Sequence, residues 1–168
     1  MESKIGVAIA GLGFGKSVHL PAINSLSSLE LKALWHPSKT KLDQITRDKT
    51  TIGYTDWEEL LEQKEIRALI ITTPPAPRFQ LAYRALEAGK HLLLEKPVGL
   101  SAEEIEKLLK LSLRKNLSVA VNFEYRAVPL FMEAKRLIDK GFIGRPWLIK
   151  LDWLMGGRAD SSRPWNWY

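Results

Sequence analysis

Residues 5–16 read IGVAIAGLGFGK, and this stretch decides the fold. Ile5 to Ala10 are apolar throughout, which predicts a buried strand. The glycines at 11, 13 and 15 then predict a tight turn before a helical stretch. Gly11 can supply the turn, and Gly13 has no side chain to block a phosphate that approaches the helix N-terminus. In this strand–turn–helix context the sequence predicts a nucleotide-binding turn.

The glycine spacing departs from the standard pattern G-x-G-x-x-G/A. Lys16 occupies its last position, and the third glycine lies one residue earlier. A purely structural turn is the other interpretation, and methyltransferases also use such turns, so the motif alone does not name a cofactor. Pro21 falls where the helix should continue, which predicts a kink or a restart.

The rest of the chain alternates between apolar strands and helices. Further strands are predicted at the ranges 31–35, 68–73, 91–94 and 118–123. Between them, capping-box patterns predict helices that open at Thr55 and Ser101, and a third helix covers 79–88. The helix after Ser101 should turn Ile105, Leu108, Leu109 and Ser112 inward. This order is typical of a doubly wound parallel α/β sheet.

The pattern changes after residue 123. A helix is predicted from Pro129 to Lys140, with apolar residues on its inward face, and an alternating strand from Arg145 to Trp153. The chain closes on the aromatic run 165–168. We expect residues 1–123 to form the dinucleotide-binding domain and residues 124–168 to begin a truncated C-terminal α/β substrate and dimerisation domain. Its exposed final strand should associate with a second copy.

The end of the second strand bears on which dinucleotide binds. A carboxylate about 20 residues beyond the glycines normally holds the ribose 2′-hydroxyl of NAD. Residues 35–39 contain no carboxylate. Ser38 and Lys39 could instead meet a 2′-phosphate, and we include His36 in the same site. NADP is therefore the favoured cofactor, NAD is the alternative, and an ordinary basic loop is the competing interpretation.

Glu95-Lys96-Pro97 follows a buried strand. Ligands of open α/β sheets bind at the carboxyl ends of the strands, so a lysine there faces the crevice. Its ammonium can polarise a carbonyl or hold an alkoxide. A lone lysine is otherwise best interpreted as a surface residue.

Composition excludes several classes of protein. The 168 residues are 45% hydrophobic and 26% charged, which argues against a disordered chain. No apolar run approaches the roughly 18 residues of a membrane span, and the N-terminus lacks a signal-peptide pattern. The absence of cysteine excludes disulfides, thiolate zinc sites and cysteine nucleophiles, and we expect no metal. We expect a cytoplasmic protein.

The net charge of +6 raises nucleic acid as a partner. Basic and acidic residues alternate along the predicted helices, as on solvated faces, and no run of five like charges occurs. We therefore expect no nucleic-acid binding; a protein that did bind DNA would show a steep salt dependence of retention.

Taken together, these motifs resemble the glucose–fructose oxidoreductase / inositol dehydrogenase (Gfo/Idh/MocA) family. The resemblance covers essentially the whole chain. It is carried by the opening segment 7–22, by the stretches 72–75 and 85–91, by Glu95-Lys96-Pro97 and by 137–144. The family implies a Rossmann domain followed by a substrate domain, and hydride transfer between a nicotinamide and a sugar, cyclitol or related hydroxy or keto compound.

The resemblance also implies site residues. Lys96 would be catalytic and lie near the nicotinamide and the substrate oxygen. Residues at the cofactor would be Gly11, Gly13, Phe14, Gly15 and Lys16 at the pyrophosphate, Thr73, Pro74 and Pro75 beside the adenosine, and Glu95 at the nicotinamide ribose. Tyr125 and Arg126 would line the substrate cleft. Two departures stand out: Lys16 replaces a small residue, and Arg78 stands where the family often has histidine.

Family members carry an aspartate and a proton-donating histidine in the substrate domain, beyond the point where this sequence stops. His19, His36 and His91 all lie in the Rossmann region and do not replace that histidine. The sequence thus favours an NAD(P)-dependent oxidoreductase that lacks most of its substrate domain. The alternative is a non-enzymatic nucleotide-binding module with a redox-sensing or regulatory role.

Overall fold

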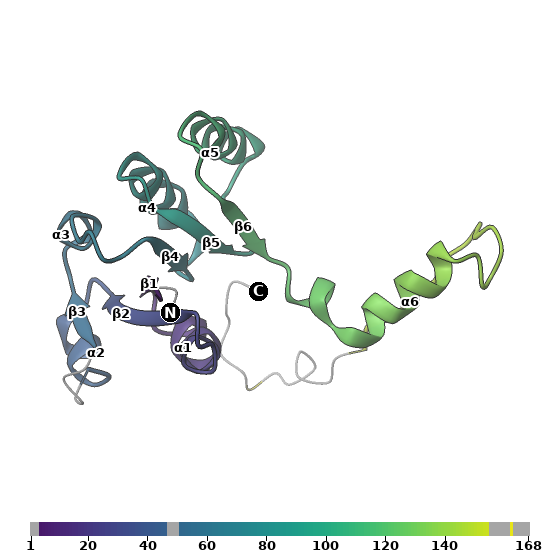
Figure 1. The fold of residues 1–168 in the computed structure, drawn as a ribbon, viewed down its shortest axis with the longest axis horizontal. Coiled ribbons are helices and arrows are strands. Elements are labelled where there is room, and N and C mark those ends of the chain that lie inside the picture. Colours follow the sequence, from purple (N-terminus) through teal and green to yellow (C-terminus); the bar gives the residue numbers. More distant parts are fainter. Residues whose placement is uncertain (1–3, 47–50, 155–161, 163–168) are drawn as a thin grey trace. The chain divides into compact units, whose positions relative to one another are not determined.

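A computed structural model describes residues 4–46, 51–154 and 162 of the chain. Its contacts divide the chain into two units, Met1–Phe123 and Glu124–Tyr168. The first unit is built on a six-stranded parallel sheet in the order β3-β2-β1-β4-β5-β6 (Figure 1). The strands are β1 Ile5–Ala10, β2 Leu29–Trp35, β3 Ile52–Tyr54, β4 Ala68–Ile71, β5 His91–Glu95 and β6 Val119–Asn122. The doubly wound parallel sheet predicted from the sequence is confirmed.

Helices cover both faces of this sheet. They are the π-helix η1 Gly15–His19, α1 Leu20–Asn24, α2 Lys39–Asp43, α3 Trp57–Leu61, α4 Pro75–Glu87 and α5 Ala102–Arg114. In Figure 1, α3, α4 and α5 lie on one face, and α1 and α2 lie on the other. The helix restart predicted at Pro21 is confirmed, because α1 begins one residue before this proline.

Alternation along β1 sends neighbouring side chains into two separate cores. Ala8 and Ala10 pack in the larger core with residues of α3, α4 and α5. Val7 and Ile9 pack in the smaller core with residues of α1 and α2. The small side chains of Ala8 and Ala10 leave room for bulky groups from those helices, and all four β1 residues are buried.

Several helix details differ from the sequence predictions. Asp56, not Thr55, caps α3, because its carboxylate accepts hydrogen bonds from the N–H groups of Glu58 and Glu59 at 2.8 and 3.0 Å. Helix α4 begins at Pro75 and not at residue 79, since prolines suit the first turn of a helix. The short strand β3 and helix α2 were not predicted, because each has too few residues for a periodic pattern.

The inward face of α5 was only partly predicted. Leu108 and Ser112 are buried as expected, and Leu111 joins them. Ile105 and Leu109 are 42% and 56% exposed, so their predicted burial is wrong. Ser101 caps the helix as predicted, with its hydroxyl accepting from the N–H of Glu104. The buried stripe of α5 is therefore narrower than its apolar sequence pattern.

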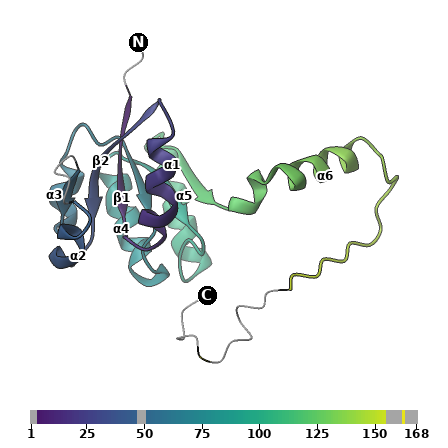
Figure 2. The ribbon, with the colours of Figure 1, turned by 90° about the horizontal axis from the view of Figure 1, so that it is seen from below.

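The second unit contains the 3₁₀ turn η2 Glu124–Ala127 and the helix α6 Pro129–Asp139 (Figure 2). The helix agrees with its predicted range, but it has no buried residue, so the predicted inward face is not covered. The predicted strand Arg145–Trp153 does not form; residues 145–154 have no regular secondary structure. A strand needs a hydrogen-bonding neighbour, and the described part of this unit offers none. The aromatic run 165–168 lies outside the described residues.

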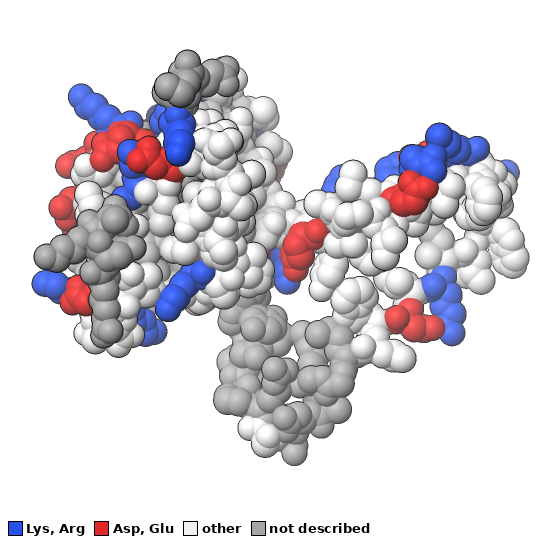
Figure 3. All heavy atoms as spheres, turned by 60° about the horizontal axis from the view of Figure 1, so that its bottom comes forward, with Lys and Arg blue, Asp and Glu red and all other residues white. Residues whose placement is uncertain are grey.

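Charged side chains are intermixed on the surface. On the face shown in Figure 3, basic and acidic residues lie next to one another over the described part of the chain. Several form surface ion pairs, such as Arg84 with Glu58 and Glu87 at 2.8 and 2.7 Å. In residues 4–46, 51–154 and 162, no helix is long and apolar enough to cross a bilayer.

Candidate cofactor and catalytic site

The site forms at the carboxyl ends of the parallel strands. Strand β1 pairs with β2 on one side and with β4 on the other. The chain therefore builds the sheet outward from β1 in one direction through β2 and β3, and in the other direction through β4, β5 and β6. In open α/β sheets, ligands bind in the crevice outside the carboxyl ends at such a point. The glycine turn follows β1 there. His36 follows β2 and Thr73 lies just past β4, the two neighbours of β1, whereas Glu95 is the last residue of β5, the next strand beyond β4.

Each glycine of the turn has a different environment. Gly11 has a φ of +99°, and a Cβ there would lie 2.6 Å from Thr72 Oγ1. A Cβ at Gly15 would lie 2.6 Å from Ile9 Cγ2 of β1. A Cβ at Gly13 would meet no described atom within 4 Å. Gly11 and Gly15 are therefore required by the fold, whereas the space beside Gly13 is open.

Lys16 does not crowd the turn. The π-helix η1 begins at Gly15, one residue before the last position of the standard motif. Gly15 therefore makes the close approach between helix and strand that the residue at that last position normally makes. The side chain of Lys16 is exposed. Phe14 is 41% exposed and packs edge-on against His19, with ring centroids 5.5 Å apart.

Residues 36–39, directly after β2, contain hydrogen-bond donors in the side chains of Ser38 and Lys39, and they contain no carboxylate. The N–H of Ser38 donates to His36 Nδ1 at 2.9 Å, which holds the imidazole at the strand end. Partial burial, together with the nearby Lys41 ammonium, lowers the pKa of His36 below its ordinary value. Ser38 precedes α2 without capping it through its side chain, and Lys39 is exposed. The assignment of these three residues to a 2′-phosphate stays a prediction.

The segment after β4 is tied to the glycine turn. Thr72 Oγ1 donates a hydrogen bond and lies 3.0 Å from the carbonyl of Ala10 and 3.1 Å from that of Gly11. Thr73 is buried, and its hydroxyl has no hydrogen-bond partner among the described residues. Pro74 and Pro75 then start α4, with Pro74 exposed and Pro75 half-buried. A buried hydroxyl without a partner beside the glycine turn fits a site whose ligand supplies the missing partner.

Glu95 ends β5 as part of a buried polar cluster. Its Oε1 accepts from His19 Nε2 at 3.0 Å and from Asn122 Nδ2 at 2.5 Å. Asn122 stands opposite Glu95 in the register of β5 and β6, whereas His19 comes from the end of the π-helix. The carboxylate therefore joins the glycine turn to the last two strands.

Arg78 is fully buried in α4 at 0% exposure, and among the described residues its guanidinium donates its hydrogen bonds to carbonyl oxygens. Nη1 donates to the carbonyls of Glu95 and Pro97, and Nη2 donates to the carbonyl of Thr73. Burial lowers the pKa of Arg78 from its ordinary value, and the Glu95 carboxylate opposes this shift. Arg78, which stands where the family often has histidine, thus links the loop after β4 to the loop after β5.

In the sequence Lys96 lies between Glu95 and Pro97, the two residues whose carbonyls accept hydrogen bonds from Arg78 Nη1. Its side chain is exposed at the carboxyl edge of the sheet, and the Lys96–Pro97 peptide bond is cis. An ammonium in this position can donate hydrogen bonds to an oxygen of a ligand in the crevice.

The sequence interpretation did not assign Thr72, His19, Arg78 or Asn122 to the site. A signal existed for Arg78, because residues 78, 82, 85 and 86 fall on one helical face and all are buried. His19 is 76 positions from Glu95, so no local pattern could have paired them.

Tyr125 and Arg126 belong to the second unit. Both are exposed in η2, and the Tyr125 ring lies 5.0 Å from that of Trp153 and 6.3 Å from that of Phe131. Arg126 helps to line a hollow of about 420 Å³ beside α6. Their predicted role in the substrate cleft stays a prediction.

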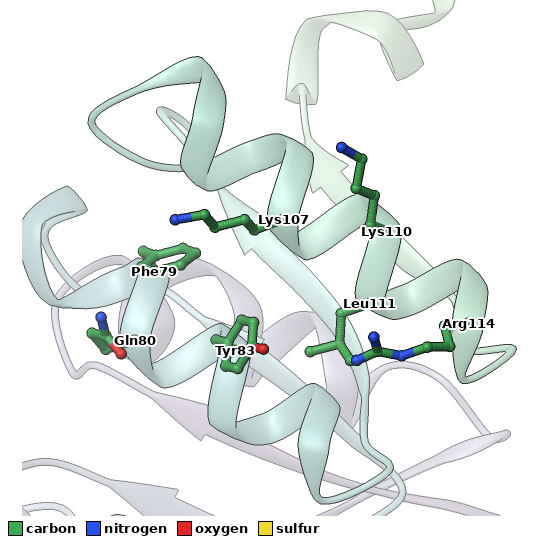
Figure 4. Close-up of a pocket in the computed structure, with 7 residues that line it drawn as sticks. All are labelled: Phe79, Gln80, Tyr83, Lys107, Lys110, Leu111 and Arg114. Atoms are coloured by element: carbon green, nitrogen blue, oxygen red, sulfur yellow. The ribbon is translucent and has the colours of Figure 1, made fainter.

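A separate groove of about 490 Å³ runs between α4 and α5 (Figure 4). Phe79, Tyr83 and Leu111 form its apolar part, and three cations and one amide complete the lining: Lys107, Lys110, Arg114 and Gln80. None of the predicted site residues lines it. The groove lies along the outer surface of the two helices, so its size does not make it the candidate site.

The residues present fit a dinucleotide. Gly13 offers an open cradle, Thr73 offers a buried hydroxyl, and the segment after β2 offers donors without a carboxylate. No group of three or more His, Asp or Glu side chains in the described ranges is arranged to hold a metal ion.

Comparison with known proteins agrees with this geometry. Residues 5–123 match the family model GFO_IDH_MocA, described as an oxidoreductase family with an NAD-binding Rossmann fold. An uncharacterized oxidoreductase of Synechocystis sp. is 38% identical over 96% of this chain and 44% of its own length. The scyllo-inositol 2-dehydrogenase (NAD(+)) of Bacillus subtilis is 32% identical over 98% of this chain and 47% of its own.

Among solved structures, scyllo-inositol dehydrogenase from Lactobacillus casei with bound NAD(H) and scyllo-inositol superposes with a TM-score of 0.78. It is 29% identical, over 84% of this chain and 43% of the other. This chain thus spans less than half the length of these relatives. The family model covers most of the chain and contains every strand of the sheet, so the chain belongs to the Gfo/Idh/MocA oxidoreductase family, and its first unit is the NAD-binding Rossmann fold of that family.

Proposed function

We propose that this chain is the cofactor-binding part of an NADP-preferring dehydrogenase or reductase that acts on a sugar, a cyclitol or a related hydroxy or keto compound. The observation that carries the proposal is that an open glycine turn and an exposed lysine both follow the carboxyl ends of parallel strands, on the same side of the sheet. Gly13 leaves room for a phosphate after β1, and Lys96 directly follows β5, which is separated from β1 by β4. Relatives with inositol dehydrogenase activity in their names support the substrate class.

Within this proposal the chain's residues have separate tasks. The N–H groups of the turn from Gly11 to Lys16 bind the pyrophosphate at the start of the π-helix. His36, Ser38 and Lys39 bind the 2′-phosphate of the adenosine ribose, and Thr73, Pro74 and Pro75 flank the adenosine. Glu95 orients the nicotinamide ribose. When bound, the nicotinamide supplies or accepts the hydride.

Lys96 acts on the substrate oxygen. Its ammonium donates a hydrogen bond to a carbonyl, which it polarises, or to the alkoxide that forms in the opposite direction. Tyr125 and Arg126 bind substrate hydroxyl groups. Residues 1–123 are the dinucleotide-binding domain in this proposal, and residues 124–168 begin the substrate domain, through which two copies associate.

The cofactor preference is tested by titrating the chain with NADPH and NADH while tryptophan fluorescence is followed. Saturable binding with NADPH tighter than NADH is expected, and the double variant Ser38→Ala/Lys39→Ala should remove that difference. Lys110→Ala on α5 is the matched control and should keep it. Equal or tighter binding of NADH would overturn the assignment of Ser38 and Lys39 to a 2′-phosphate.

The catalytic role is tested in the complete protein by following reduction of NADP⁺ and NAD⁺ with a panel of cyclitols and sugars. Lys96→Ala should lower turnover by about 10²-fold or more, the range of general acid–base contributions, with cofactor affinity nearly unchanged. Lys110→Ala again serves as the control. Unchanged turnover in Lys96→Ala would remove the lysine from the mechanism. Cofactor binding without turnover of any such compound would favour the regulatory nucleotide-binding module.

A further inference from the structure

We infer that Arg78 is a positioning residue for Lys96, and that it makes the loops after β4 and β5 move as one body. The inference rests on the proposed function, because it concerns how the lysine is held beside a bound nicotinamide.

The first step is the arrangement of the acceptors. The carbonyls of Glu95 and Pro97 precede and follow Lys96 in the chain, and both accept from the same nitrogen of Arg78. The backbone on either side of the lysine is therefore held at one point. A rotation of this segment that redirects the lysine side chain would break at least one of these hydrogen bonds.

The second step is the link to the adenosine side. The other terminal nitrogen of Arg78 donates to the carbonyl of Thr73, the residue that follows β4 and precedes the two prolines. One guanidinium thus joins the loop proposed to flank the adenosine to the loop that carries the lysine. The planar fork of the guanidinium holds its donors in fixed relative directions, which a lysine ammonium does not reproduce.

The third step is the cost of placing a cation there. Arg78 has 0% exposure, its Nε is buried, and that atom has no hydrogen-bond partner among the described residues. No carboxylate in the described chain accepts a hydrogen bond from it. A buried guanidinium is expensive, and a helix could fill the same space with an apolar side chain at lower cost. A packing role alone does not account for the arginine, whereas control of the two loops does.

The cluster around Glu95 extends the same support. The Glu95 carboxylate is held from the other side by His19 and Asn122. Glu95 is therefore fixed through its side chain by η1 and β6 and through its carbonyl by α4. The backbone position of Lys96, the next residue, is therefore set by contacts of Glu95 with η1, β6 and α4.

The test measures the position of the lysine and not only activity. In the complete protein, Lys96 is acetylated with trace acetic anhydride with and without saturating NADPH, and its labelling rate is compared with that of Lys110 by mass spectrometry. In the unaltered protein NADPH should protect Lys96. In Arg78→Met and Arg78→Lys, saturating NADPH should give at least threefold less protection, with Arg78→Lys the milder of the two.

Arg84→Met is the matched control, because Arg84 lies on the same helix and its ion-pair partners in the described part of the chain are the surface carboxylates of Glu58 and Glu87. It should leave the protection ratio unchanged. A role in stability alone would lower the melting temperature of the Arg78 variants but not the ratio at saturating NADPH. If Arg78→Met does not fold, Arg78→Lys, which keeps the cation, carries the test.

Wild-type protection in Arg78→Lys would overturn the inference, and so would absence of protection in the unaltered protein when NADPH is bound. The failure of the proposed function is distinguishable from either result. If Lys96→Ala keeps full turnover while the Arg78 variants lose protection, the catalytic role of the lysine is wrong and the positioning role stands. If Lys96→Ala is inactive and the Arg78 variants are fully protected, only the positioning role is wrong.

Discussion

Gly13 and Gly15 stand two residues apart in one turn, and the structure gives them opposite constraints. A Cβ at Gly15 would collide with Ile9 of the central strand, whereas a Cβ at Gly13 would enter open space. The sequence shows only that both are glycine. At the scale of single residues, the fold therefore accounts for the glycine at position 15, and the proposed cofactor accounts for the glycine at position 13.

This difference predicts a separation of stability from binding. Gly15→Ala should lower the free energy of unfolding by about 1–3 kcal/mol, the usual cost of overpacking a core. Gly13→Ala should change it by less than about 0.5 kcal/mol, as most surface substitutions do, yet weaken NADPH binding roughly tenfold, or about 1.4 kcal/mol. Urea unfolding and fluorescence titration measure the two quantities. Full NADPH affinity in Gly13→Ala would show that no phosphate lies against the turn.

His36 provides a prediction about pH. Its pKa is lower in the folded chain than in the unfolded chain, so the unfolded state binds more protons in the interval below pH 6.5. Stability should therefore fall as the pH is lowered through that interval. His36→Gln should lose less stability over the same range. Parallel urea unfolding curves of the two proteins at pH 7.5 and 5.5 test this, and an identical loss in both would contradict it.

At the scale of elements, a helix as short as α3 depends on its cap and on its packing for stability. Helix α3 has five residues, yet it places Trp57, Leu60 and Leu61 in the larger core, where the Trp57 ring lies 5.1 Å from that of Trp35. A helix this short has little stability of its own. Its position is set by core packing and by the cap at Asp56.

The cap can be tested against its neighbour. Asp56→Ala should lower the free energy of unfolding by about 1 kcal/mol, because two N–H groups lose their acceptor. Thr55→Ala, the cap expected from the sequence pattern, should change it by less than about 0.5 kcal/mol. Thermal unfolding of both variants decides between the two caps, and the reverse order of effects would show that Thr55 caps the helix.

At the scale of the whole molecule, the two units differ in how well they bury apolar side chains. The first has two cores, one on each face of the sheet. In the second, no residue of α6 is buried, and Trp147, Ile149 and Leu151 are 89%, 81% and 75% exposed. Apolar surface of this kind favours association.

The 168-residue chain should therefore self-associate in a concentration-dependent manner. Sedimentation velocity over a range of concentrations should show species larger than the monomer, and the double variant Trp147→Ser/Ile149→Ser should shift them toward the monomer. Leu26→Ser, a substitution of an exposed leucine in the first unit, serves as the control. A single monomeric species at the highest concentration would refute the prediction.

The sequence by itself determined the parallel sheet, the glycine turn and the strand end that carries Lys96. These features depend on neighbours in the chain: apolar runs of strand length, turn glycines and helix starts. Five of the six strands were predicted for this reason, whereas Ile52–Tyr54 was too short to show a pattern.

Tertiary structure alone decided the remaining points. The cluster of His19, Glu95 and Asn122 and the contacts of Arg78 with three carbonyls join residues that are far apart in the chain. Packing also decided which apolar residues of α5 are buried and left Arg145–Trp153 without strand pairing. The physical reason is the same in each case: a hydrogen bond or a buried surface needs a partner, and only the folded chain shows which partner is within reach.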